Sequence, residues 1–221
     1  MLPRLAAEFV GTALLLAVVV GSGIMGERLA NGNTAIALLA NSLATGGGLF
    51  VLILTFAPVS GAHFNPLVTA GAVLDRALPI RLAAGYLAAQ LGGALCGAAL
   101  AHAMFEAPLW AASATARTGA GQLIAEAVAT FGLLLTLRGT ARYGTPVLAA
   151  AVGTFIAAAY WFTASTSFAN PAVTVARALT PTFAGIRPDD VAGFLAAQCV
   201  GAALAFAYVR LHADVWSESS R

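Results

Sequence analysis

Six long apolar segments restrict the folds that are open to this chain. They lie at roughly 5–25, 36–58, 82–104, 120–138, 146–165 and 190–211. A helix needs about 20 mostly apolar residues to cross the hydrocarbon core of a bilayer. Of the 221 residues, 60% are hydrophobic and only 9% are charged, which is too little charge for the surface of a soluble domain. We therefore expect an all-α integral membrane protein with one domain, residues 1–221, and six transmembrane helices.

The remaining composition excludes several classes of function. A net charge of +2 is too small to indicate nucleic acid binding. Cys96 and Cys199 lie in apolar segments without metal-ligand spacing, so we expect them to pack, and we expect no metal and no cofactor. No nucleophile and base stand together as in an enzyme. Glu8 interrupts the first apolar segment, which we interpret as a retained helix rather than a signal peptide.

Two connectors between the apolar segments have an unusual composition. One reads SGAHFNPLVTAGAVLDRALP, between the second and third segments, and the other reads STSFANPAVTVARALTPTFAGIRP, between the fifth and sixth. Both are too apolar for loops in water and too short to span a membrane. Half-length apolar segments of this kind are candidates for re-entrant structure.

The two halves of the chain resemble each other. Three pairs of residues align in the same order, at separations of 118, 105 and 108 residues: Glu8 with Glu126, Asn65 with Asn170, and Gln90 with Gln198. Each half, about 1–105 and about 118–212, holds three apolar segments. Because three is odd, the second half must enter the membrane from the opposite side, which predicts an inverted repeat.

The Asn-Pro pairs explain how the connectors fold. Pro66 and Pro171 would break a spanning helix, but proline is favoured in the first turn of a helix, where its missing N–H has no partner anyway. Asn65 and Asn170 then occupy the N-cap positions. An inverted repeat brings both helix N-termini, with their positive dipole ends and amides, to one central lumen.

These features together resemble the aquaporin family of channels. The resemblance covers nearly the whole chain and rests on the duplicated Asn-Pro boxes, the paired glutamates and the paired glutamines. It implies a homotetramer whose protomers each conduct, with Asn65 and Asn170 donating hydrogen bonds to passing solutes. It also implies that Glu8 and Glu126 brace the re-entrant loops. Carbonyl groups that line such a pore would belong to Gly61, Ala62, His63, Thr166, Ser167 and Phe168.

Two departures from the family pattern are visible. The first box reads Asn65-Pro66-Leu67, whereas the second has the usual alanine, Asn170-Pro171-Ala172, and we expect Leu67 to pack on the opposing loop. The second departure is Val173, at the position where most relatives have an arginine. Residue counting places the other positions of this outer filter at Thr45, Ser167 and, within one residue, Ala158.

Replacing the usual bulky filter with Thr45, Ala158, Ser167 and Val173 predicts a wider and less polar opening. Arginine offers five donors and a fixed charge, both of which valine lacks. We expect small uncharged solutes such as glycerol, urea and arsenous acid. The run from Asn170 to Thr174 also resembles a bacterial subgroup linked to arsenic resistance. Arg177, one turn after Val173, either reaches the outer vestibule or has a structural role near the surface.

Two alternatives stay open: a pore mainly for water, and a secondary transporter of small neutral solutes, since transporters also use inverted repeats. The arginines predict the orientation in a bacterial inner membrane. With both termini in the cytoplasm, the inner side holds seven arginines and the outer side four, in accordance with the positive-inside rule. The inner set is Arg4, Arg76, Arg81, Arg138, Arg142, Arg210 and Arg221, and the outer set is Arg28, Arg117, Arg177 and Arg187.

Overall fold

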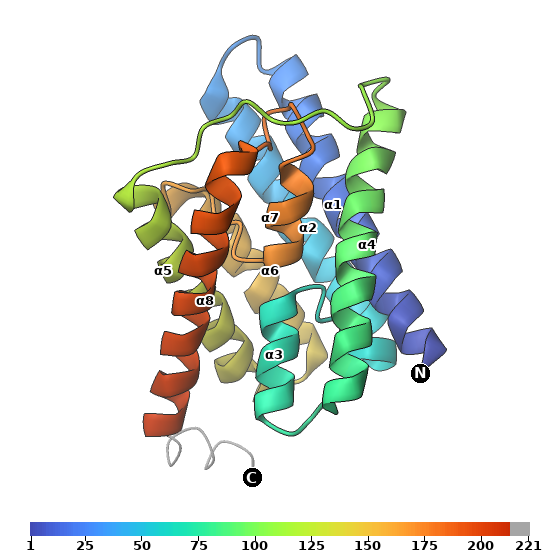
Figure 1. Cartoon of the computed structure of the whole chain (residues 1–221), viewed down its shortest axis with the longest axis vertical. Helices are drawn as coiled ribbons and strands as arrows, with labels where there is room; N and C mark the ends of the chain where they lie inside the picture. The colour runs from blue at the N-terminus through green and yellow to red at the C-terminus, as the bar shows by residue number, and fades with distance from the viewer. Residues whose placement is uncertain (213–221) are drawn as a thin grey trace.

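Six long helices and two short ones make up the computed structural model, which describes residues 1–212 and contains no strand in that range (Figure 1). Arg221, one of the inner arginines, lies outside the described residues. The elements are α1 (Leu2–Leu29), α2 (Thr34–Ser60), α3 (Pro66–Leu74), α4 (Ile80–Met104), α5 (Ala120–Thr140), the 3₁₀ turn η1 (Ala141–Tyr143), α6 (Thr145–Phe162), α7 (Pro171–Arg177) and α8 (Pro188–Leu211).

The long helices confirm the six predicted spans, because each contains an 18-residue window that is apolar enough to cross a membrane. The short helices α3 and α7 arise from the two connectors and begin at the predicted prolines. In Figure 1, α7 lies above α3, with their N-terminal ends near mid-height. We call the end of the molecule formed by loops 105–119 and 178–187 the upper end. The lower end holds the start of α1 and the end of α8 (Figure 1).

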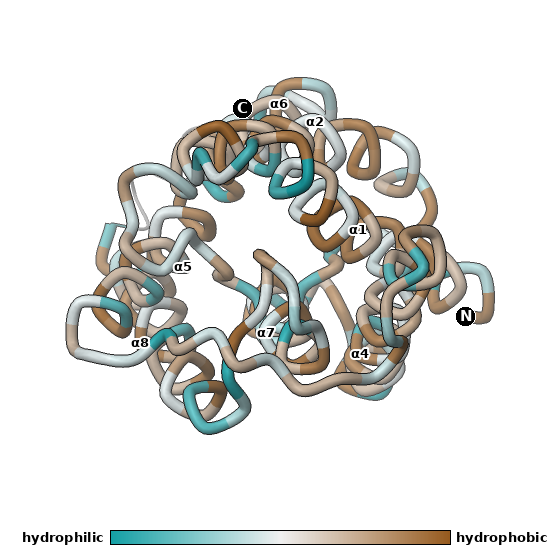
Figure 2. Tube along the Cα trace, turned by 90° about the horizontal axis from the view of Figure 1, so that it is seen from above, coloured by the Kyte–Doolittle hydropathy of each residue, from teal (hydrophilic) through white to brown (hydrophobic). Residues whose placement is uncertain are grey.

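The packing follows the repeat. In the first half α1 contacts α2 and α4, and in the second half α5 contacts α6 and α8 in the same way. The halves meet mainly where α2 packs on α6. Viewed from above, the long helices form a ring, and α7 lies between α4 and α8 (Figure 2). The ring leaves the two re-entrant segments as the elements that approach its centre.

Glycines permit the closest helix crossings. A Cβ built on Gly46 of α2 would lie 2.7 Å from the carbonyl oxygen of Gly153 on α6. A Cβ on Gly97 of α4 would collide with the backbone of Ala13 on α1. Small residues that allow backbones to approach are the usual means of packing helices in a bilayer.

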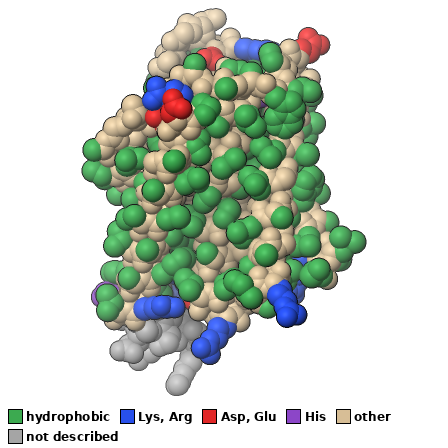
Figure 3. All heavy atoms as spheres, in the orientation of Figure 1, with side chains coloured by type: hydrophobic (Ala, Val, Ile, Leu, Met, Phe, Trp, Pro, Cys, Tyr) green, Lys and Arg blue, Asp and Glu red, His purple; other side chains and the backbone are tan. Residues whose placement is uncertain are grey.

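The outer surface is apolar along the sides, and its charged side chains gather near the two ends (Figure 3). Exposed residues on this surface include Leu43, Val51, Ile124 and Leu204. A surface of this kind suits lipid rather than water.

Candidate functional site

The N-termini of α3 and α7 meet at the centre of the molecule, each capped by an asparagine. The Oδ1 of Asn65 accepts a hydrogen bond from the backbone N–H of Leu67 at 2.9 Å. The Oδ1 of Asn170 accepts one from the N–H of Ala172 at 3.0 Å. Both residues therefore hold the N-cap position that the sequence predicts.

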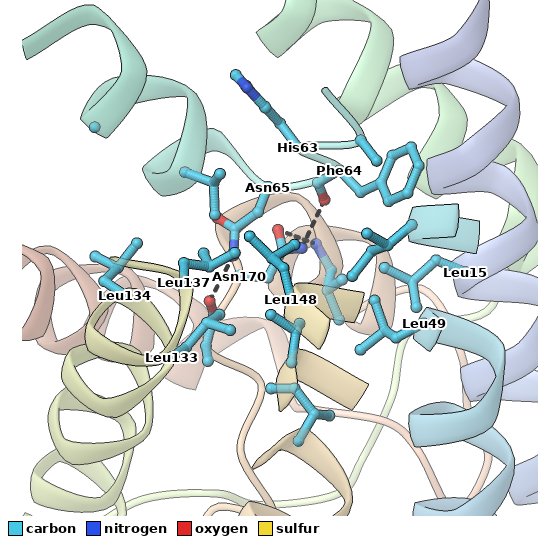
Figure 4. A pocket seen from close by; sticks show the side chains of 18 of the residues that line it. Leu15, Leu49, His63, Phe64, Asn65, Leu133, Leu134, Leu137, Leu148 and Asn170 are labelled. Atoms are coloured by element: carbon cyan, nitrogen blue, oxygen red, sulfur yellow. Dashed lines mark hydrogen bonds between the residues drawn. The ribbon is translucent and has the colours of Figure 1, made fainter. Parts of the chain in front are cut away.

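The two asparagines also tie the loops together. The Nδ2 of Asn65 donates to the carbonyl oxygen of Ala169 at 2.8 Å, and the Nδ2 of Asn170 donates to that of Phe64 at 2.7 Å (Figure 4). An amide has two N–H donors, and each of these cross-bonds uses one. Both asparagines line the central cavity, so each has a second N–H available for a molecule inside it.

A buried carboxylate holds each re-entrant loop from behind. Glu8 accepts hydrogen bonds from the backbone N–H groups of His63 and Phe64, at 3.0 and 2.8 Å, and from Ser60 and Gln90. Charge-assisted bonds of this kind are stronger than neutral ones. The carboxylate thereby satisfies loop donors that lipid or an apolar core would leave unpaired.

Glu126 does the same in the second half. It accepts from the N–H groups of Phe168 and Ala169 at 2.8 and 2.9 Å, and from Nε2 of Gln198 at 2.6 Å. Gln198 also donates to Thr174 on α7. The hydrogen-bond donors to Glu8 and Glu126 among the described residues are backbone N–H groups of the re-entrant loops and the side chains of Ser60, Gln90 and Gln198. Neither carboxylate lines the central cavity, so both support the loops from outside it.

The central cavity has a volume of about 300 Å³ and passes the two asparagines. One end is lined by Thr45, Tyr160 and Arg177, and the other reaches Asp75 and Arg138 at the lower end of the molecule, which form an ion pair. Between them the walls are mostly apolar, and Figure 4 shows Leu15, Leu49, Leu133, Leu137 and Leu148 around the asparagines. A lining with few polar groups gives a solute few positions at which it binds strongly.

Most residues expected at the pore line this cavity. They include Gly61, Ala62, His63, Ser167 and Phe168 from the loops, and Thr45 and Val173 from the outer filter. Thr166 lines a second cavity at the upper end instead. The Oγ of Ser167 has no hydrogen-bond partner among the described residues although the residue is only 3% exposed.

The prediction of Ala158 as a lining residue is wrong. Ala158 is exposed on the outside of the bundle, and Ile156 and Tyr160 of α6 face the cavity. The hydroxyl of Tyr160 lies 3.3 Å from Oγ1 of Thr45. Counting from Asn170 failed because it assumes one loop conformation and cannot fix the rotation of α6. A buried tyrosine needs a partner for its hydroxyl, but only the structure shows that Tyr160 is buried.

We expected Leu67 to pack on the opposing loop, and this prediction is wrong. Leu67 packs against α5 and α8 instead. Its neighbours in a small apolar cluster are Leu134, Ala202 and Ala205. The reason is its direction: the residue after the proline points away from the cavity, into the gap between the half-helix and the long helices. Ala172, its counterpart, is likewise buried outside the cavity lining.

Two arginines at the upper end complete the site. Arg177 is buried and lines both the central and the upper cavity, whereas Arg117, in the loop before α5, lines only the upper one. Desolvation by burial lowers the pKa of Arg117 relative to a solvated guanidinium, and the fields of Tyr160 and Glu126 oppose this. Sequence reasoning missed Arg117, because a single arginine in a loop carries no spacing signal.

The match to a known family decides what this arrangement is. Residues 1–147 match the major intrinsic protein family. The chain belongs to this family. It is therefore a channel protein that crosses the membrane several times, and not an enzyme.

Relatives and solved structures of the family resemble the chain to different extents. Aquaglyceroporin AqpS of Rhizobium meliloti (strain 1021) is 50% identical over 207 residues, which cover 94% of this chain and 88% of that protein. The probable aquaporin PIP2-8 of Oryza sativa subsp. japonica is 40% identical over 139 residues, covering 59% and 49%. The X-ray structure of the aquaglyceroporin from Plasmodium falciparum superposes with a TM-score of 0.72 at 21% identity, covering 94% and 95%, and shows the same fold.

Proposed function

We propose that the protein is a passive pore for small uncharged solutes, with glycerol, urea and arsenous acid as candidates. The observation that carries this proposal is the central cavity, in which two asparagine amides stand among mostly apolar walls between two polar ends. Such a lining replaces part of a solute's hydration without holding it tightly, which favours rapid passage. The similarity to an aquaglyceroporin over most of the chain supports solutes larger than water.

Thr45, Ser167 and Val173, joined by Tyr160, form the outer filter in this proposal. Val173 projects less volume than an arginine and lacks its five N–H donors, and Ser167 lines the cavity beside it. Tyr160 restores part of the volume that a filter with Ala158 would lack. A compact solute with several hydroxyls, such as arsenous acid or glycerol, suits an opening that is moderately wide and has few donors.

The assembly and the location follow the same reasoning. The apolar sides of the protomer support a multi-pass protein in a bacterial inner membrane with both termini in the cytoplasm, as the distribution of arginines predicts. We further propose a homotetramer of independently conducting protomers. Crosslinking in native membranes, followed by mass measurement, tests the stoichiometry.

Flux measurements in proteoliposomes test the proposed function. We expect the wild-type protein to pass glycerol and arsenous acid as well as water, with a weak dependence on temperature. The variant Val173→Arg narrows the opening, so the ratio of glycerol to water flux falls about tenfold, within the range by which a pocket discriminates on size. Val173→Leu, which adds little volume and no charge, is the matched control and keeps the ratio within about twofold.

Each alternative has its own outcome in this experiment. A wild-type protein that passes water but neither glycerol nor arsenous acid is a water pore. Saturable flux with a steep temperature dependence indicates a transporter. If Val173→Arg leaves the ratio unchanged, Val173 is not in the filter.

A further inference from the structure

Arg177 belongs to the lining of both cavities described above, the central one and the upper one. It is the last residue of α7 and stands one helical turn beyond Val173. It lines the central cavity together with Val173, and it lines the upper cavity together with Thr166 and Arg117. A solute that moves between the cavities therefore passes this side chain.

The guanidinium of Arg177 is fixed on one side and open on the other. Its Nε donates to the carbonyl oxygen of Ala184, and its Cζ lies 3.3 Å from the centroid of the Phe168 ring. Its backbone oxygen accepts a bond from Ile186 at 3.1 Å, so loop 178–187 wraps around it. The described residues offer its two terminal nitrogens no hydrogen bond. The roughly four N–H donors on these nitrogens are available to a molecule in the passage.

Arg117 strengthens the positive charge at this place. Its Nε donates to the carbonyl oxygen of Gly185 at 2.7 Å, its Nη1 donates to that of Ser165 at 3.1 Å, and its Cζ lies 4.9 Å from the Phe168 ring. Two guanidiniums thus share one aromatic ring, an arrangement that cation–π attraction favours. Within residues 1–212, neither guanidinium has a carboxylate oxygen within the 4.0 Å of an ion pair. The nearest carboxylate contact in this range is at the backbone of Arg117, whose N–H donates to Oδ2 of Asp190 at 2.8 Å.

We propose that Arg177, supported by Arg117, supplies the charge barrier and the outer hydrogen-bond donors of the pore, in place of the arginine that most relatives carry at the position of Val173. This inference rests on the proposed function as a pore for uncharged solutes. As a consequence, the size limit and the exclusion of cations depend on different residues. Val173 sets the width of the outer filter. Arg177 excludes cations from a position one helical turn away, where it does not narrow the filter.

A matched pair of solutes isolates the charge barrier. Urea and the guanidinium ion have nearly the same planar shape, but only guanidinium carries a charge. We expect wild-type proteoliposomes to take up urea and to exclude guanidinium. In Arg177→Gln the ratio of urea to guanidinium uptake falls about tenfold, because charged groups at a narrow site create potentials of several kT. Arg177→Lys keeps the charge and restores most of the ratio.

Arg28→Gln is the control for a charge at the same end of the molecule. Arg28 is exposed on the last turn of α1 and lines neither cavity. We expect the ratio of urea to guanidinium uptake in Arg28→Gln to stay at the wild-type value. Glycerol flux is measured in the same vesicles. If the wild type passes none of glycerol, urea and arsenous acid, the proposed function is overturned. Normal glycerol flux with an unchanged ratio in Arg177→Gln would overturn only the assignment of Arg177.

A second measurement leaves Arg177 in place, in case its replacement prevents folding. Ser167→Cys, in a background with Cys96→Ala and Cys199→Ala, puts a thiol on the central cavity near the two arginines. We expect a negatively charged methanethiosulfonate to modify this thiol about tenfold faster than a positively charged one, relative to their rates with a free thiol in solution. Equal relative rates, or no reaction with either reagent, would overturn the proposal.

Discussion

The two re-entrant segments share one backbone scaffold but differ in the side chains around it. In both, a buried glutamate accepts two loop N–H groups, a glutamine joins it, and an asparagine caps the half-helix and crosses to the other loop. In the first loop, the ring of His63 packs edge-on against Tyr86, with centroids 5.2 Å apart. In the second, Phe168 packs on Phe194 in the same geometry at 5.1 Å, and two arginines lie on its ring.

This difference shows how a symmetric scaffold can produce an asymmetric pore. The duplicated residues form hydrogen bonds with backbone groups of the loops, and they thereby fix the positions of the loops and the directions of the helix dipoles. The residues that distinguish the two ends of the cavity vary between the halves. At the lower end the charges that line the cavity belong to the ion pair of Asp75 and Arg138, whereas at the upper end Arg177 has no acidic partner among the described residues.

The largest expected effect comes from removing one scaffold carboxylate. Glu8→Gln and Glu126→Gln each leave backbone donors facing an amide that cannot accept all of them. We expect each to lower the free energy of unfolding by about 3 kcal/mol or more, since bonds to a charged group are worth about 1.5–3 kcal/mol each. Glu8→Gln is the more severe, because Glu8 also accepts a bond from Ser60 and the described contacts of Glu126 include no serine bond. Thermal unfolding in detergent, compared between the two variants, measures the order. A greater loss of unfolding free energy in Glu126→Gln than in Glu8→Gln would contradict the expectation that Glu8 stabilises its loop more strongly.

The residues after the two prolines differ, and exchanging them tests whether the boxes are interchangeable. Leu67→Ala empties part of the cluster between α3, α5 and α8, and we expect a loss of about 2–3 kcal/mol. Ala172→Leu overfills a buried site of the second half, and we expect a loss of about 1–3 kcal/mol. Both are measured by thermal unfolding, with urea flux as a check that the pore remains intact. If neither exchange changes the unfolding temperature, the sites at positions 67 and 172 accept the same side chains.

The filter assignment on α6 predicts a contrast between two close positions. Tyr160→Phe removes the hydroxyl that faces Thr45, so we expect a loss of about 1 kcal/mol and a change in the ratio of glycerol to water flux. Ala158→Leu lies on the exposed surface of the same helix and should leave that ratio unchanged. Stopped-flow measurements on proteoliposomes read both variants. If Ala158→Leu changes the flux ratio and Tyr160→Phe does not, the filter residue on α6 is Ala158, as residue counting predicted.

The smallest effect is expected at the lower mouth. Asp75 and Arg138 form an ion pair in which both side chains are 38% exposed. Solvent screening limits such a pair to about 0–1 kcal/mol. We therefore expect Asp75→Asn to change the unfolding temperature little and to leave the urea to guanidinium ratio unchanged, in contrast to Arg177→Gln at the opposite end. A strong rise in guanidinium exclusion in Asp75→Asn, which leaves Arg138 unpaired, would show that charge at the lower end also controls the barrier.

The sequence predicted the architecture and the N-cap positions of Asn65 and Asn170 correctly, because these depend on local chemistry. Apolar length set the six spans, and proline and asparagine set where each half-helix begins. It was less successful around the cavity. Ala158 was placed wrongly, and Leu67 was given the wrong neighbours. Both errors concern the direction of a side chain, which depends on the rotation and crossing of whole helices rather than on any local pattern.

The sequence by itself determined that this chain crosses a membrane six times, repeats itself in inverted orientation and brings two asparagines to the centre. Those properties follow from hydrophobicity, from helix capping and from the odd number of spans in each half. Only the tertiary structure decided which residues face the cavity: Tyr160 on α6, and Arg177, which lines both cavities. The physical reason is that a spanning helix presents every direction to its surroundings, and only its packing against the other helices selects the side that becomes the wall of the pore.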